Sequence, residues 1–163
     1  MIRVAPCRCS DVDPAEHVRF HGYIRALSEV PDSSEHGLLM QILEDPDRAM
    51  AESVVIGHLD RRALALNNDD VAFTAWCHRI ADALRGHELA ERRLREWMLL
   101  HEIDSGRPWD TADLVQASDW LQRRLAELAE LADSEQALTT LAIHGRTSRI
   151  RNAARSRLDH RPT

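Results

Sequence analysis

The chain of 163 residues contains no lysine, so each of its 21 basic side chains is an arginine. Without lysine, the protein cannot form a lysine Schiff base, and it cannot place a Walker A or kinase-type lysine on a nucleotide phosphate. The codon bias of a GC-rich genome accounts for the preference, because alanine, arginine and leucine are all abundant. The absence therefore excludes several enzyme classes without indicating a function.

Cysteine and long apolar runs are also scarce. Three cysteines, an odd number, argue against a disulfide framework. Residues 1–7 have no apolar core like that of a signal peptide, and no apolar run approaches the ~20 residues that cross a bilayer. The hydrophobic fraction of 44 % still suffices for a folded core. We therefore expect a cytoplasmic protein with no membrane partner.

Amphipathic helices separated by short polar breaks are the recurring pattern. Apolar residues recur at helical spacing, and no segment alternates as a β-strand does. Asp13-Pro14 and Asp45-Pro46 are typical helix starts, Asp69 and Thr147 are plausible caps, and Gly86 is a typical terminator. The sequence predicts an all-α protein of about eight helices. These span residues 13–30, 32–43, 45–66, 69–86, 88–103, 110–132, 133–145 and 147–158.

Two segments 100 positions apart are similar to each other, and each follows a short helix that contains leucine. The first contains the loop Asp45-Pro46-Asp47, and the second contains Ile150-Arg151-Asn152-Ala153-Ala154. They resemble HEAT repeats, in which a short Asp-Pro-Asp loop often joins two antiparallel helices, and the second helix opens with an aliphatic residue, arginine and small residues. The first segment lacks the arginine and the second lacks the loop.

The resemblance covers about a third of the chain and implies a superhelix of stacked antiparallel helical hairpins. Stacking would cover the apolar face that each hairpin exposes, and the chain has room for about four hairpins. An irregular helical bundle is the alternative. We expect residues 1–12 to be a flexible segment, residues 13–158 to form one helical domain, and residues 159–163 to be a tail.

Metal-binding and catalytic patterns are weak. Cys7, Cys9, His17 and His21 have residue types that bind zinc, but the Cys-x-Cys spacing is tighter than usual, so we expect no metal or cofactor. Cys77 and its neighbour His78 point to different sides of a helix, so we predict no catalytic residue and treat a zinc-dependent or cysteine enzyme as the weakest alternative. Four further histidines near expected helix ends should be solvated: His58, His87, His101 and His144.

The tryptophans and one leucine-rich helix suggest packing roles. Trp109 precedes a helix cap, where it could staple the turn or stand exposed as a contact residue. The other three tryptophans, on apolar helix sides, should be core residues: Trp76, Trp97 and Trp120. The expected helix over 110–132 carries a heptad-like seam from Leu114 to Ala132. This seam could dock a helix of the same chain or form a homodimer.

The charge distribution is the strongest functional signal. Six arginines and one aspartate lie in residues 142–163, a local net charge of +5, which leaves −11 for residues 1–141 within the total of −6. This basic end could touch phosphate, an acidic partner, or the acidic remainder of its own fold. The candidate partner- or phosphate-binding residues are Arg146, Arg149, Arg151, Arg155 and Arg157.

The sequence thus favours a non-enzymatic helical-repeat module that binds a protein or peptide. Repeat stacks present extended surfaces for such partners, and no coherent catalytic constellation is recognisable. Nucleic-acid binding through the arginine-rich C-terminal helix is the alternative. The acidic body of the protein opposes it, because a duplex is strongly anionic.

Overall fold

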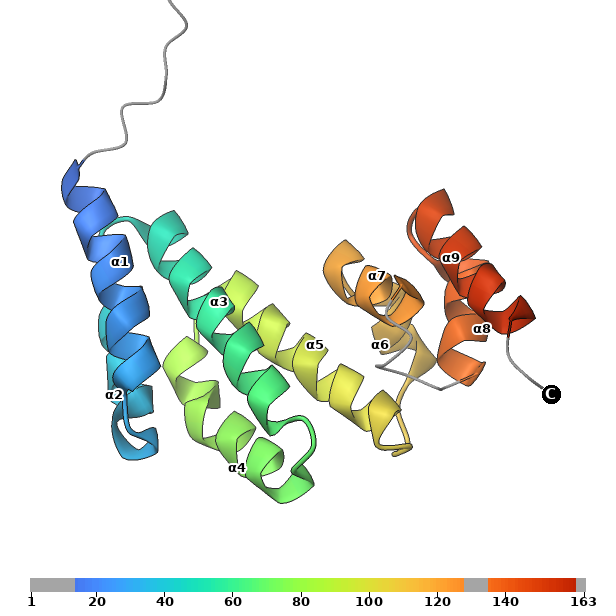
Figure 1. Ribbon diagram of the computed structural model, residues 1–163, viewed down its shortest axis with the longest axis horizontal. Coiled ribbons are helices and arrows are strands. Elements are labelled where there is room, and N and C mark those ends of the chain that lie inside the picture. Colours follow the sequence, from blue (N-terminus) through green and yellow to red (C-terminus); the bar gives the residue numbers. More distant parts are fainter. Residues whose placement is uncertain (1–13, 128–134, 161–163) are drawn as a thin grey trace, which may run out of the picture.

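The computed structural model describes residues 14–127 and 135–160, which form helices joined by short turns and contain no strand (Figure 1). The predicted all-α class is therefore confirmed for these segments. The α-helices are α1 (Pro14–Glu29), α2 (Asp32–Leu43), α3 (Arg48–Leu66), α4 (Asp70–Ala81), α5 (Glu88–Asp104), α6 (Thr111–Gln116), α7 (Asp119–Glu127), α8 (Glu135–His144) and α9 (Ser148–Asp159). A 3-10 turn, η1 (Asp82–Leu84), follows α4.

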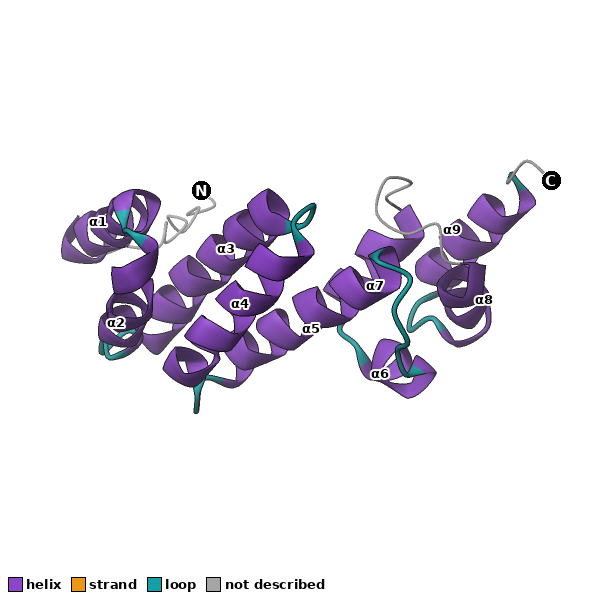
Figure 2. Ribbon diagram, turned by 90° about the horizontal axis from the view of Figure 1, so that it is seen from below, coloured by secondary structure: helices purple, strands orange, loops and turns teal. Residues whose placement is uncertain are grey.

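The helices contact one another in two rows. The odd-numbered helices α1, α3, α5, α7 and α9 touch in that order, so they run as one series along the molecule. Helices α2 and α4 pack beside the first part of this series. Helix α8 packs beside the last part, and α6 packs on α8. Figures 1 and 2 show the resulting elongated shape, with α1 and α2 at one end and α8 and α9 at the other.

Short polar side chains determine where several helices begin. The Asp69 carboxylate accepts the backbone N–H of Ala72 at 2.9 Å, and the Thr147 hydroxyl accepts that of Ile150 at 3.2 Å, so both predicted caps are confirmed. The predicted start of the third helix at Asp45 is wrong, because α3 begins at Arg48 with Asp47 as its cap. Asp45 instead accepts the Asp47 backbone N–H and the Tyr23 hydroxyl, which fixes the loop before α3.

The expected single helix over 110–132 is also wrong. Ala117 has an extended backbone, with ψ of 156°, and separates α6 from α7. The side-chain amide of Gln122 donates to the carbonyls of Leu114 and Val115, so the break leaves these buried acceptors satisfied. The backbone N–H of Ser118 donates to Glu96 at 2.7 Å and attaches the start of α7 to α5. This break raises the number of α-helices in the described segments from the expected eight to nine.

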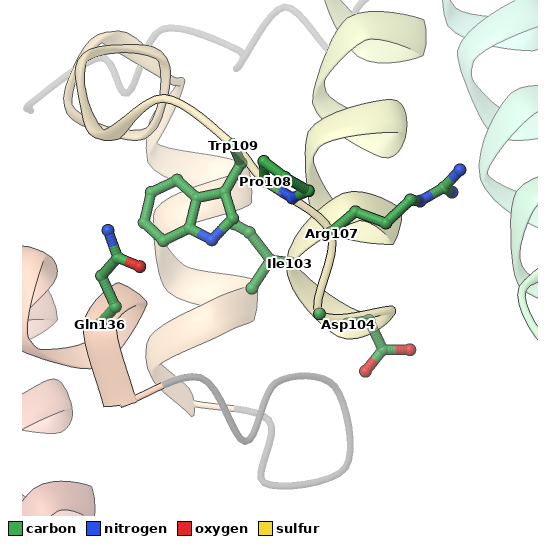
Figure 3. Close-up of a pocket in the computed structure, with 7 residues that line it drawn as sticks. Ile103, Asp104, Arg107, Pro108, Trp109 and Gln136 are labelled. Carbon is green, nitrogen blue, oxygen red and sulfur yellow. The ribbon is translucent and has the colours of Figure 1, made fainter.

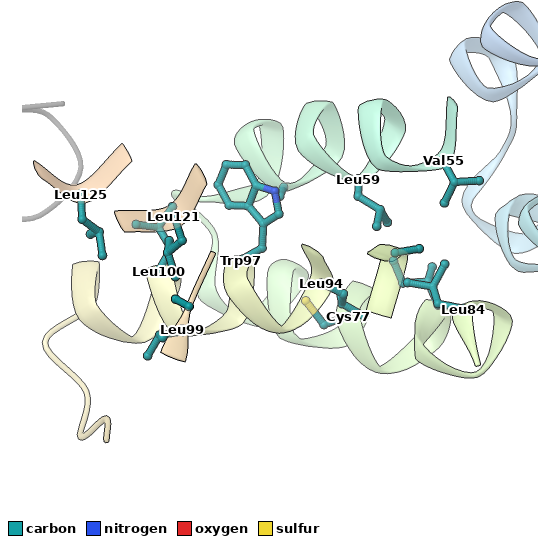
Figure 4. Packing of buried hydrophobic residues seen from close by; sticks show 14 of the residues in the cluster. Val55, Leu59, Cys77, Leu84, Leu94, Trp97, Leu99, Leu100, Leu121 and Leu125 are labelled. Carbon is teal, nitrogen blue, oxygen red and sulfur yellow. The ribbon is translucent and has the colours of Figure 1, made fainter. Parts of the chain in front are cut away.

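A continuous apolar core runs between the two rows (Figure 4). Trp76 and Trp97 are fully buried, as predicted, whereas Trp120 is half-buried against the core. Leu114, Leu121 and Leu125 of the expected seam are completely buried within the chain. The described part of the seam therefore packs against other residues of the same chain. Leu128 and Ala132 lie outside the described residues.

Candidate functional site

The loop between α5 and α6 forms one wall of an open cavity of about 660 Å³ (Figure 3). Gly106 turns the chain there with a φ of +66°, in the left-handed region that favours glycine. Arg107 then reaches away from the cavity to the carboxylate of Asp70 at 2.6 Å. The indole of Trp109 packs against the core and points toward Gln136 of α8, so this residue both supports the loop and lines the cavity.

Helix α6 stands between two further cavities. One, of about 480 Å³, separates α6 from α8 and is lined by Val115 and Ile143. The other, of about 390 Å³, separates α6 from α5 and is lined by Met98, and Gln116 borders both. These three apolar side chains are exposed to solvent, Ile143 by 62 %. We call the region the α6 surface: Met98, Thr111, Val115, Gln116, Thr139, Thr140 and Ile143.

Charged residues surround the α5 side of the α6 surface. Arg92, Glu102 and Asp113 line the same cavity as Met98, and both signs of charge are present. An apolar centre with a polar rim of mixed charge is typical of sites that bind other proteins. The arrangement supplies contact area and a few polar partners.

The predicted arginines of α9 mainly contact the protein itself. Arg151 donates to the carbonyl of Gly145 at 2.7 Å, and Arg155 donates to that of Ala142 at 2.9 Å. Both carbonyls belong to the end of α8, where the last turn of a helix leaves acceptors without partners inside the helix. These two guanidinium groups therefore cap α8 from the neighbouring helix.

Arg146, in the turn before α9, and Arg157 of α9 attach the preceding helices in the same way. Arg146 donates to the carbonyl of Ala117 at 3.1 Å, just after α6, and Arg157 donates to that of Leu125 at 2.5 Å, near the end of α7. The basic segment thus binds the ends of three helices in its own fold. Contact with phosphate or with an acidic partner stays a prediction.

Only part of the predicted zinc pattern lies in the described residues. His17 and His21 are exposed on α1, with ring centroids 5.1 Å apart, whereas Cys7 and Cys9 lie outside those residues. Within residues 14–127 and 135–160, no group of three histidine, cysteine, aspartate or glutamate side chains could hold a metal ion.

Cys77 lies in the core between α4 and its neighbours and is 2 % exposed. Burial raises the pKa of its thiol to about 12, so the group is a protonated thiol at neutral pH. The thiolate is the nucleophilic form of cysteine. In this environment Cys77 therefore packs as an apolar residue.

A buried polar cluster joins α2, α3 and α4, and the sequence interpretation missed it. The Glu35 carboxylate, 1 % exposed, accepts a hydrogen bond from His58 at 2.7 Å and another from the Trp76 indole at 3.0 Å. Arg79 donates to its second oxygen at 3.3 Å. The expectation of a solvated His58 is wrong, as it is for His101, because both side chains are 2 % exposed. A detectable signal was present, since Glu35 occupies the apolar stripe four residues before Leu39.

The geometry determines the protonation of this cluster. Arg61 lies 3.1 Å from Nδ1 of His58, and a guanidinium can only donate, so Nδ1 accepts and Nε2 carries the proton given to Glu35. Burial raises the pKa of Glu35, but the hydrogen bonds from His58 and Trp76 and the charge of Arg62 outweigh it and lower the pKa to about 2. Glu35 lines none of the three cavities described above, and its contacts join α2, α3 and α4.

Comparison of the chain with protein-family models, with curated proteins and with solved structures finds no match. In the described segments no helix combines the length and the apolar character that a membrane span needs.

Proposed function

We propose that this protein is a non-enzymatic, HEAT-like helical-repeat module that binds a protein or peptide partner on its α6 surface. The observation that carries the proposal is the position of Met98, Val115 and Ile143. These exposed apolar side chains gather at two adjoining cavities, although such residues are usually scattered on a protein surface. A partner that inserted its own apolar side chains beside α6 would bury Met98, Val115 and Ile143 away from water.

The two rows of helices support the repeat interpretation. In a stack of helical hairpins, each unit contacts mainly its neighbours, and an apolar core continues from one end to the other. The serial contacts of the odd-numbered helices and the continuous core agree with that organisation. Stacks of this kind present long surfaces, so a partner can contact several helices at once.

The proposal predicts that the partner is lost when α6 surface residues become charged. The doubly substituted protein Val115→Asp, Ile143→Asp should stay folded, because exposed positions change stability by only about 0.5 kcal/mol. It should fail to retain the partner that the unchanged protein captures from its native host. A photocrosslinking residue at position 115 should join that same partner to α6.

The matched control places the same change elsewhere. Val18 and Leu64 are exposed by 73 % and 48 % and lie on α1 and α3, away from the α6 surface. The protein with Val18→Asp and Leu64→Asp should keep its partner. Equal retention by both variants, or equal loss, would contradict a binding site at α6.

Nucleic-acid binding through the C-terminal arginines is the rival proposal. It predicts retention on DNA or RNA that falls steeply with salt and weakens when Arg151 and Arg155 are replaced. It has less support because these guanidinium groups already cap α8, and Arg149 pairs with Glu127 at 2.9 Å. No retention at low salt would remove it.

A further inference from the structure

Two tryptophans and two arginines meet where α5 and α7 lie beside α3. The indole of Trp97 donates to Asp60 at 2.7 Å, and Arg93 donates to the same carboxylate at 3.2 Å. The guanidinium carbon of Arg93 lies 3.7 Å from the centre of the Trp120 ring. The two tryptophan rings meet edge to face, with centroids 5.5 Å apart. We call this group the tryptophan–arginine cluster: Asp60, Arg93, Trp97, Trp120 and Arg124.

Arg124 differs from the other half-buried arginines. Its guanidinium lies over Trp97 and Trp120, 4.8 and 5.5 Å from their ring centres, but it makes no hydrogen bond or ion pair with any described residue. Its Nε is buried and has no acceptor among the described residues, while the residue as a whole is half-buried. Each of the others contacts a carboxylate or carbonyl oxygen: Arg62, Arg79, Arg93, Arg107, Arg151 and Arg157.

The charges of the cluster do not balance. Asp60 is its one carboxylate, and Arg93 and Trp97 already occupy both oxygens of that group. Burial lowers the pKa of Arg124, Asp60 opposes this effect, and the nearby charge of Arg93 adds to it. The buried Nε–H of Arg124 is a costly donor, because the ring contacts supply it with no oxygen acceptor. A bound anion would supply both the missing charge and the missing acceptors.

We propose that Arg124 anchors a binding site for a small oxyanion, a phosphate or carboxylate group held by the terminal nitrogens of its guanidinium. The planar guanidinium matches the paired oxygens of both groups. Arg93 covers one face of Trp120 at stacking distance, so that face is closed to an aromatic ligand. The site therefore recognises negative charge and oxygen geometry. It lies on the odd-numbered row of helices and is independent of the α6 surface.

The test titrates isotopically labelled protein with inorganic phosphate and, separately, with acetate. We follow the NMR signals of the arginine Nε–H and tryptophan indole N–H groups at about 150 mM NaCl. At this ionic strength the Debye length is about 8 Å, so exposed charges further apart than that interact weakly. The Arg124 and Trp97 signals should shift and saturate with at least one anion. The anion that binds with the lower Kd identifies the ligand group. If neither anion gave a saturable shift, the proposal would be overturned.

Two variants separate this site from general charge attraction. Arg124→Gln should weaken binding at least about tenfold, which is the loss of one charge-assisted hydrogen bond. Arg123→Gln removes the same charge one residue away, from an exposed arginine that pairs with Asp119, and should change affinity less than about twofold. Equal effects of the two substitutions would overturn the proposal.

Arg124→Lys is a second variant that should stay folded, because it keeps the positive charge over the tryptophans. Lysine offers a point charge without the planar fork, so binding should still fall clearly below that of the unchanged protein. Unchanged affinity in this variant would show that Arg124 is not a bidentate anchor.

Discussion

At the scale of single residues, Glu35 joins three helices that are distant in the sequence. Its hydrogen-bond partners His58 and Trp76 lie 23 and 41 residues further along the chain. A buried carboxylate is costly alone, and here two N–H donors and the nearby arginines compensate for it. Removing its charge would leave two half-buried guanidinium groups, those of Arg62 and Arg79, without this carboxylate, so one substitution has a large expected effect.

We predict that Glu35→Gln lowers the free energy of unfolding by about 3 kcal/mol at neutral pH, the usual cost of breaking a buried ion pair. The folded-state pKa of about 2 lies below the unfolded value near 4.3. The charged Glu35 therefore stabilises the protein above the unfolded value, and this contribution is lost as pH falls through about 2. Urea unfolding at several pH values should show the two proteins converging in acid.

Glu29→Gln provides the comparison for that experiment. Glu29 has a side chain that is 67 % exposed, and it pairs with Arg25 on the same helix. Its loss should change stability by less than about 0.5 kcal/mol. If both glutamine variants unfolded at the same urea concentration, the role given to the buried carboxylate would be wrong.

At the scale of helices, the turn between α8 and α9 depends on a close approach at Gly145. A Cβ atom there would lie 2.6 Å from the carbonyl oxygen of Leu141 and 2.8 Å from a methyl group of Ile150. Neither neighbour is the free end of a flexible chain. The two helices pack closely because this position has no side chain.

We therefore predict that Gly145→Ala destabilises the protein by about 2 kcal/mol, the range of overpacking substitutions. Gly57→Ala has the opposite expected sign. Gly57 lies inside α3 with open space around it, and alanine is favoured over glycine in a helix by about 1 kcal/mol. Thermal unfolding of the two variants checks both signs, and a stabilised Gly145→Ala would contradict the packing described for this turn.

Helix boundaries were predictable where the signal is local. Asp69 and Thr147 cap helices through contacts three residues away, so their side chains alone indicate the start. The break at Ala117 was missed because the leucine spacing continues across it, from Leu114 to Leu121. The acceptor partners that permit the break come from Gln122, whose role depends on tertiary structure.

At the scale of the whole molecule, the buried leucine seam predicts the oligomeric state. Leu121 is completely buried, so Leu121→Glu should unfold the protein, and sedimentation of the unchanged protein should show a monomer. The control is Leu89→Glu, since Leu89 is 47 % exposed and should tolerate the charge. A folded monomer from Leu121→Glu, together with a dimer of the unchanged protein, would instead place the seam between two subunits.

The site was less predictable than the fold. Composition and periodicity suffice for an all-α class, because each helix shows its apolar side in its own sequence. The α6 surface and the tryptophan–arginine cluster combine residues from separate helices, and no local pattern relates Asp60 to Arg124. The charge asymmetry pointed to the arginines of residues 142–163 as candidate binding residues. Four of them contact carbonyls of the same molecule, and binding of a partner there stays a prediction.

Those arginine contacts also divide the molecule by its response to acid. Arg146, Arg151 and Arg157 reach the ends of α6, α8 and α7 through backbone carbonyls, so these contacts involve no acidic side chain. The opposite end depends on the carboxylate of Glu35, which does titrate in strong acid. Strong acid thus acts on the joint between α2, α3 and α4 through a buried carboxylate, whereas the arginine contacts to the ends of α6, α7 and α8 are made to backbone carbonyls.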